Sequence, residues 1–220
     1  MGLDMYLDKV KRINTDVTPT ELDKIQSFLR WKDENARCSF NEWCGIDESE
    51  INHDLAKAYE SEFITRYASW DKQKKYGTKS IFTEVAYWRK ANQIHNWFVN
   101  NIQDGTDDCG SYEVTKADII ILLALCKTVK NNSELVSGNI VNGYRYDNDG
   151  NSIPIIREGK TIKDPGIAIK LLPTTTGFFF GSNEYNEYYM KNINYTIKTL
   201  EEILIKTDFK KEMLVYSSSW

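Results

Sequence analysis

The stretch from Glu84 to Ile102 reads EVAYWRKANQIHNWFVNNI and contains neither glycine nor proline. At about 100° per residue, its apolar side chains gather on one side, which is typical of an amphipathic helix. This apolar stripe consists of Tyr87, Ala91, Ile94, Phe98 and Ile102, widened by Trp88 and Val99. The opposite, polar face holds Arg89, Gln93, Asn96 and Asn100. We therefore predict one helix over 84–102 at the centre of the fold.

The length and composition predict one folded unit. The chain has 220 residues, enough for one full core, so we expect a single globular domain over 1–220. Hydrophobic residues make up 41% of the chain and aromatic residues 13%, which favours a globule over a disordered chain. The net charge of −4 argues against a protein with a broad basic face, so nucleic acid is not a favoured partner.

The sequence shows no pattern for membrane insertion or secretion. Its longest apolar run, from Ile119 to Cys126, is far shorter than the roughly 20 residues of a membrane span. The N-terminal MGLDMYLDK lacks the basic and apolar regions of a secretory signal. None of the four cysteines lies in a CxxC pattern, which favours reduced thiols. We therefore predict a cytoplasmic protein with no membrane partner.

Local signals outside the central stretch predict further helices and strands. Alternating side chains over Leu3–Lys9 predict a strand. Thr18 caps a helix that runs to about Lys32, and Thr115 caps another over 116–131. A helix is expected at about 50–59, and Ser182 or Asn183 is expected to cap another that runs to about Lys206. Residues 137–163 are expected to form hairpins or a long excursion, with a turn at Asn148-Asp-Gly150, and strands are expected at 178–180 and 212–218.

Together these elements predict an α+β fold that is mainly helical. The helices over 84–102 and 116–131 are expected to form a central antiparallel pair, joined by the acidic loop 104–110. A small antiparallel sheet is expected to join the N- and C-terminal strands and to include Phe178–Phe180.

Recognised catalytic and metal-binding patterns are missing from the sequence. It contains no GxSxG, GxxxxGK[ST], GxGxxG or HExxH motif, and its two histidines are His53 and His95. The aspartates of the loop 104–110 do not follow the EF-hand pattern. We therefore predict no metal and no cofactor, and we leave open whether the protein is an enzyme. His95 is either a hydrogen-bonded core residue or a general acid–base assisted by Glu84 or Asp118.

Two segments combine polar groups with aromatic rings and predict a ligand site. Gly177–Ser182 precedes a helix, and its glycines either serve only strand and cap geometry or let backbone N–H groups bind an anion, while nearby rings suit base stacking. The predicted cation is Arg89 or Lys90, and the predicted stacking surface is Tyr185 or Phe178. The candidate ligand-binding residues are Tyr87, Trp88, Arg89, Asn92, His95, Gly177, Phe178, Gly181, Ser182 and Tyr185.

Four motifs, MGLDMYL, YWRKANQIHNWF, LLPTTTGFFFGSNEYNEYY and the terminal YSSSW, resemble an uncharacterised family of phage and prophage proteins. The resemblance implies a phage origin and assigns no reaction. The predicted function is non-catalytic binding of a small polar or nucleotide-like ligand, with counter-defence by sequestering a host signal molecule as the expected role. Alternatives are a small-molecule-modifying enzyme using His95 and a protein-binding inhibitor or accessory protein. The expected partner is a small-molecule ligand or a host protein, and a homo-oligomer is left open.

Overall fold

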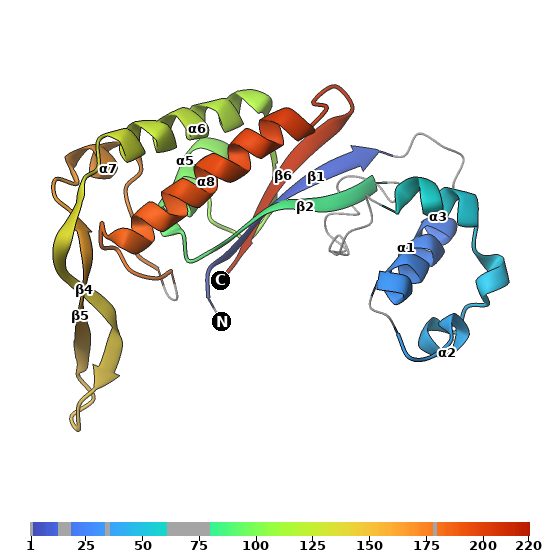
Figure 1. Cartoon of the computed structure of the whole chain (residues 1–220), viewed down its shortest axis with the longest axis horizontal. Helices are drawn as coiled ribbons and strands as arrows, with labels where there is room; N and C mark the ends of the chain where they lie inside the picture. The colour runs from blue at the N-terminus through green and yellow to red at the C-terminus, as the bar shows by residue number, and fades with distance from the viewer. Residues whose placement is uncertain (1, 13–18, 34–35, 61–79, 178–179) are drawn as a thin grey trace. The chain divides into compact units, whose positions relative to one another are not determined.

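The computed structural model (Figure 1) describes residues 2–12, 19–33, 36–60, 80–177 and 180–220. By their internal contacts these residues divide into two compact units. The first unit contains Met1–Tyr6, Ala86–Lys206 and Tyr216–Trp220, and the second contains Leu7–Val85 and Thr207–Val215. Three strands continue from one unit into the other: β1 (Asp4–Arg12), β2 (Ser80–Arg89) and β6 (Glu212–Ser219). The single domain expected from length stays a prediction.

A four-stranded sheet has the order β2-β1-β6-β3, where β3 is Ser111–Val114. β1 follows the predicted alternation, because Leu3, Met5 and Leu7 are each 0% exposed. The pairing of β1 with β6 confirms the prediction that the first and last strands share a sheet. Both chain ends are thereby held by backbone hydrogen bonding.

The predicted helix over 84–102 is wrong in its first half. Residues 80–89 form strand β2, and only α5 (Asn92–Ile102) is helical. Phe82, Ala86 and Trp88 lie at even spacings along β2 and are at most 6% exposed. The buried residues of this part therefore follow the two-residue period of a strand rather than the period of a helix. Lys90, with φ of 56°, breaks the strand before α5 begins.

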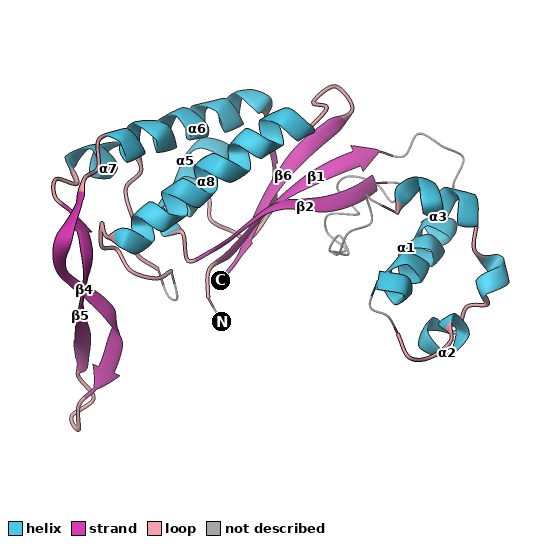
Figure 2. Cartoon of the chain, viewed as in Figure 1, coloured by secondary structure: helices cyan, strands magenta, loops and turns pink. Residues whose placement is uncertain are grey.

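The central helix pair also differs from the prediction. α6 (Lys116–Asn131) has the predicted bounds, with Thr115 and Asp118 forming a capping box. It packs most extensively on α8 (Glu187–Lys206) rather than on α5 (Figure 2). α8 begins later than predicted, because Asn186 still forms an isolated bridge to Thr161. Its buried side chains recur along most of the helix, so α8 packs a continuous apolar face against α6.

The predicted hairpin is confirmed as β4 (Leu135–Tyr146) and β5 (Ser152–Ile162), a separate two-stranded sheet. Asp147 closes its turn by accepting from the backbone N–H groups of Asp149 and Asn151. The short helix α7 (Gly166–Leu171) follows the hairpin.

The second unit has its own helical core. It contains α1 (Pro19–Asp33), α2 (Phe40–Cys44), a 3₁₀ turn η1 (Glu48–Glu50) and α3 (His53–Tyr59). α1 confirms the predicted helix, although Thr18, its expected cap, lies outside the described residues. Asn52 caps α3, so this helix starts later than predicted. The buried core consists of Ile25, Phe28, Leu29, Phe40, Ile51 and Ala56.

The fold is α+β, but the prediction of a mainly helical domain with a small sheet is wrong. Two sheets with long strands share the structure with the helices. The error arose because aromatic residues such as Tyr87 and Trp88 fit a helical stripe and an alternating strand equally well. Phe180 lies in a loop rather than a strand, and Phe178 and Phe179 lie outside the described residues. Among the described helices, none is long and apolar enough to cross a membrane.

Candidate functional site

The strand conformation of β2 places Trp88 on the opposite face from Tyr87 and Arg89. Trp88 is 2% exposed, and its indole N–H donates to Thr196 Oγ1 at 2.9 Å. This predicted ligand residue therefore belongs to the core between the sheet and α8. Tyr87 is partly exposed and Arg89 is exposed on the other face.

Asp4 on β1 contacts both Tyr87 and Arg89. The Tyr87 hydroxyl donates to Asp4 Oδ1, and Arg89 Nη1 lies 3.2 Å from the same oxygen. The hydrogen bond to Asp4 raises the pKa of Tyr87, because the carboxylate stabilises the protonated phenol. Contacts with Tyr87 and Asp4 raise the pKa of Arg89. Near neutral pH the phenol is therefore uncharged and the guanidinium is charged.

A second tyrosine extends this arrangement into an aromatic pair. The ring centroids of Tyr6 and Tyr87 lie 5.4 Å apart with an interplanar angle of 32°. This separation falls within the usual range for interacting aromatic rings. Both residues are partly exposed.

The side chains of Arg89 and Lys90 converge at Gly2. A Cβ atom built on Gly2 would lie 3.3 Å from Lys90 Cε and 3.4 Å from Arg89 Nη2. Two cationic side chains therefore approach one point on the backbone, beside the carboxylate of Asp4. We call these residues, Gly2, Asp4, Tyr6, Tyr87, Arg89 and Lys90, the Gly2 cluster.

The segment around Gly181 lies directly against Lys90. A Cβ on Gly181 would lie 3.0 Å from Lys90 Cβ, and its φ of 94° also favours glycine. Asn92, at the start of α5 and 1% exposed, donates to the carbonyls of Phe180 at 3.2 Å and Ser182 at 3.0 Å. The structure thus brings together the two segments that the sequence suggested would form one site.

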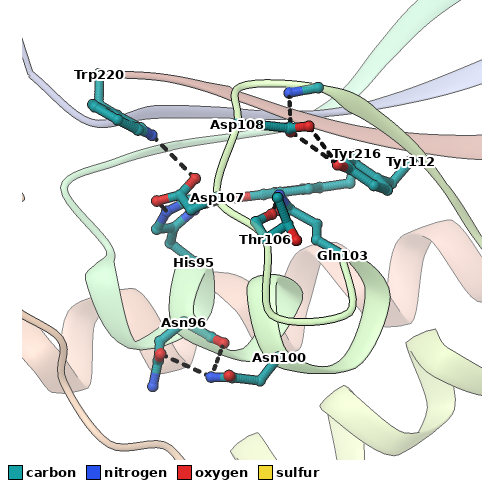
Figure 3. A network of polar contacts seen from close by, with 11 residues as sticks. His95, Asn96, Asn100, Gln103, Thr106, Asp107, Asp108, Tyr112, Tyr216 and Trp220 are labelled. Atoms are coloured by element: carbon teal, nitrogen blue, oxygen red, sulfur yellow. Dashed lines mark hydrogen bonds and ion pairs between the residues drawn. The ribbon is translucent and has the colours of Figure 1, made fainter.

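His95 is buried and lies in a hydrogen-bond network that reaches the surface at Trp220 (Figure 3). Its Nδ1 is 2.8 Å from the Tyr216 hydroxyl, and its Nε2 is 2.9 Å from Asp107 Oδ2. Because a carboxylate only accepts, Nε2 carries hydrogen, and in the neutral imidazole the Tyr216 hydroxyl donates to Nδ1. Trp220 Nε1 donates to the second oxygen of Asp107 at 3.1 Å. We call His95, Asp107, Tyr216 and Trp220 the His95 network.

Aromatic rings pack against Tyr216 and His95 of the His95 network. Phe98 stacks on Tyr216 with ring centroids 3.9 Å apart, and Phe180 meets the His95 ring edge-on at 5.2 Å. His95 is 1% exposed and Tyr216 is 0% exposed. Burial raises the pKa of Tyr216 well above its usual range, so its phenol stays protonated. The network therefore ties α5, the loop at Asp107 and the C-terminal strand together.

The carboxylate that contacts His95 is one the sequence did not single out. The prediction named Glu84 or Asp118, yet Asp118 accepts from the backbone and hydroxyl of Thr115 in the α6 cap. Asp107 was interpreted only as part of a connecting loop. Its position follows from the chain reversal after α5, which no local pattern encodes.

Most other predicted ligand residues have structural contacts. The Tyr185 hydroxyl accepts from the backbone N–H of Thr174 at 3.2 Å, and its carbonyl accepts from Ile162 N–H at 2.9 Å. Gly177 packs against the Phe180 ring, which a Cβ would meet at 2.5 Å. Ser182 accepts from Glu184 N–H at 3.1 Å. Phe178 lies outside the described residues.

The sequence interpretation missed Gly2, Asp4 and Tyr6. A signal was present, because the alternation in MGLDMYL places Asp4 and Tyr6 on one face of the first strand. The prediction used that alternation only for the core. Among the described residues, no group of three or more His, Cys, Asp or Glu side chains is placed to hold a metal ion.

Comparison with protein-family models, with curated proteins and with solved structures finds no match to this chain. The chemistry of the Gly2 cluster and of the His95 network is therefore the basis for proposing a function.

Proposed function

We propose that this protein binds a small anionic ligand of the nucleotide type, without transforming it, at the Gly2 cluster. The convergence of Arg89 and Lys90 beside the Tyr6–Tyr87 ring pair carries this proposal. The site would provide positive charge for phosphate and aromatic surface for a base.

The cationic side chains of the cluster suit the phosphate of such a ligand, and the tyrosine rings suit its base. Arginine offers a planar fork of donors that matches phosphate oxygens, and lysine adds a compact charge. Tyrosine rings support base stacking with little regard for base identity. Asp4 competes with the ligand for Arg89, which keeps the guanidinium in place when the site is free. The site thus has charge, orientation and a stacking surface within one cluster.

The resemblance to phage proteins supports a biological role for such binding. We propose that the protein sequesters a nucleotide-type signal molecule of the host and so acts in counter-defence. Binding without turnover is sufficient for this role.

An enzyme based on His95 has less support. The imidazole is 1% exposed and both its nitrogens have protein partners. A substrate would have to displace Tyr216 or Asp107 to reach it, whereas the Gly2 cluster presents an Arg89 side chain that is 55% exposed.

Calorimetric titration of the purified chain tests the proposal. The probes are adenosine 5′-monophosphate, adenosine and inorganic phosphate, which separate the contributions of phosphate and base. We expect the nucleotide to bind at least about tenfold more tightly than either fragment, because both parts of the site are then used. Equal affinities for all three would contradict the proposal.

Two substitutions assign the binding to the Gly2 cluster. Arg89→Ala is expected to weaken nucleotide binding about tenfold, because a charge-assisted contact to phosphate is lost. Lys127→Ala is the matched control, since Lys127 is an exposed cation paired with Glu201 on α8. A similar loss in both variants would show that general charge, rather than the cluster, attracts the ligand. Mass spectrometry of ligands that co-purify from infected cells would then identify the natural compound.

A further inference from the structure

Consecutive residues of a strand point to opposite faces, yet Arg89 and Lys90 bring their side chains to one place. Along β2, Trp88 is buried on the core face and Arg89 is exposed on the other. A regular strand would direct Lys90 to the core face, on the same side as Trp88. Instead, a Cβ atom built on Gly2 would lie 3.3 Å from Lys90 Cε and 3.4 Å from Arg89 Nη2. The alternation is therefore broken at Lys90.

The backbone conformation of Lys90 accounts for this break. Its φ of 56° is left-handed, a conformation that crowds the Cβ atom of any residue except glycine. Its N–H still donates to the Leu3 carbonyl at 2.8 Å, so β2 stays paired with the N-terminal segment up to this residue. The chain turns only there, and the side chain turns with it.

The two similar residues elsewhere in the described part of the chain help to interpret this conformation. Besides the glycines and Lys90, only Asp104 and Cys109 have a positive φ among the described residues. Asp104 follows α5, where a left-handed residue commonly ends a helix, and aspartate tolerates this conformation better than most residues. Lys90 precedes a helix, and lysine has no such tolerance. A glycine would make the same turn without crowding, so the advantage of lysine lies in its side chain.

A second segment holds the turn at Lys90. A Cβ atom on Gly181 would lie 3.0 Å from Lys90 Cβ and 3.3 Å from the Lys90 carbonyl oxygen. The carbonyls on either side of this glycine, those of Phe180 and Ser182, accept from the Asn92 amide at 3.2 Å and 3.0 Å. Asn92 is 1% exposed, so water competes little for these hydrogen bonds. Lys90 therefore packs against a fixed residue, and only glycine leaves room for it there.

We infer that the left-handed backbone at Lys90 is a positioning device, which turns the Lys90 ammonium to the side of Arg89 and lowers stability in doing so. Gly181 is the positioning residue that holds this turn. The inference rests on the anion site proposed for the Gly2 cluster. Strain of this kind persists where the surrounding contacts hold it, and it is found mostly at functional sites. With both cations on one side, a phosphate can meet the arginine fork and the lysine charge together.

Two substitutions at Lys90 separate the loss of the cation from the relief of strain. Lys90→Ala and Lys90→Gly both remove the ammonium, and each is expected to weaken adenosine 5′-monophosphate binding about tenfold in calorimetric titration. Only Lys90→Gly also removes the crowded Cβ atom, so its urea midpoint is expected to exceed those of Lys90→Ala and the wild-type chain. Asp104→Gly is the matched control, because it changes a left-handed residue outside the Gly2 cluster and is expected to leave nucleotide affinity unchanged.

Gly181→Ala tests the positioning while both cations are kept. The added Cβ atom would press on Lys90 Cβ, so nucleotide affinity is expected to fall about threefold. In the Lys90→Gly chain that contact is absent, and Gly181→Ala is expected to cause no further loss of affinity. A role in folding alone would not make one effect depend on the other. Circular dichroism checks that each variant folds, and the two Lys90 variants decide the inference if Gly181→Ala does not fold.

The outcomes distinguish this inference from the proposed function. A Lys90→Ala chain that binds the nucleotide as tightly as wild type, while Arg89→Ala binds it more weakly, would overturn the inference and leave the proposed function standing. So would a Lys90→Gly chain that is no more stable than Lys90→Ala, or a loss from Gly181→Ala that persists in full in the Lys90→Gly chain. A wild-type chain that does not bind the nucleotide would overturn the proposed function, and this inference with it.

Discussion

The His95 network and the Gly2 cluster both use residues from one stretch, 84–102, but the network buries its residue of that stretch, His95, whereas the cluster exposes Arg89. His95 is 1% exposed and has a protein partner at each ring nitrogen. The Arg89 side chain is 55% exposed and shares its carboxylate partner, Asp4, with Tyr87. A polar group surrounded by aromatic rings is therefore structural where the chain satisfies its hydrogen bonds, as at His95, and is a candidate for ligand binding where its donors remain accessible, as at Arg89. Substitutions in the two regions should accordingly affect different properties.

A substitution in the His95 network should lower stability more than any other change proposed for these two regions. His95→Ala should lower the free energy of unfolding by about 3 kcal/mol, because it leaves a cavity and removes hydrogen bonds to Tyr216 and Asp107. Urea denaturation followed by tryptophan fluorescence measures this loss. An unchanged midpoint would mean that the network does not hold the fold together.

The fall in the free energy of unfolding at alkaline pH should distinguish Tyr216 from Tyr87. Burial raises the pKa of Tyr216 above the value of about 10 in the unfolded chain. Its contribution is therefore fully present below pH 10 and is lost as pH rises above it, by up to about 1.4 kcal/mol per pH unit. In the Tyr216→Phe variant the urea midpoint, measured at several pH values, should fall less steeply as pH rises above 10. Tyr87→Phe should change the slope much less, because solvent screens its exposed contacts with Asp4.

Arg89→Ala should produce the opposite pattern from His95→Ala. Nucleotide affinity is expected to fall about tenfold while the urea midpoint stays at the wild-type value, since an exposed ion pair contributes little to stability. Calorimetry and denaturation on the same preparation provide both readings. If stability fell and affinity did not, the Gly2 cluster would have to be regarded as structural.

The smallest expected effect comes from Asp4→Asn and has the opposite sign. Removing this carboxylate frees Arg89 from its competitor, so phosphate-containing probes should bind about threefold more tightly. The gain should shrink as salt concentration rises. Weaker binding would show that Asp4 orients Arg89 more than it competes with the ligand.

Elements with strong local signals were predictable from the amino-acid pattern alone. The helix over 116–131 has a capping box and a continuous apolar run, and its bounds were predicted without error. The first and last strands were found from alternation, and the hairpin from the turn at Asn148-Asp-Gly150. Arg89, Lys90 and Tyr87, which lie in the Gly2 cluster, were named from the sequence for a ligand site, and that site stays a prediction.

How these elements pair and pack depends on contacts between distant parts of the chain. Residues 84–89 fit helical and strand periods alike, and pairing within the sheet selected the strand. Asp107 reaches His95 through a chain reversal, and Gly2 and Asp4 reach Arg89 by strand pairing across more than 80 positions. Such contacts depend on the three-dimensional path of the chain, whereas periodicity and capping report only on neighbours within a few residues.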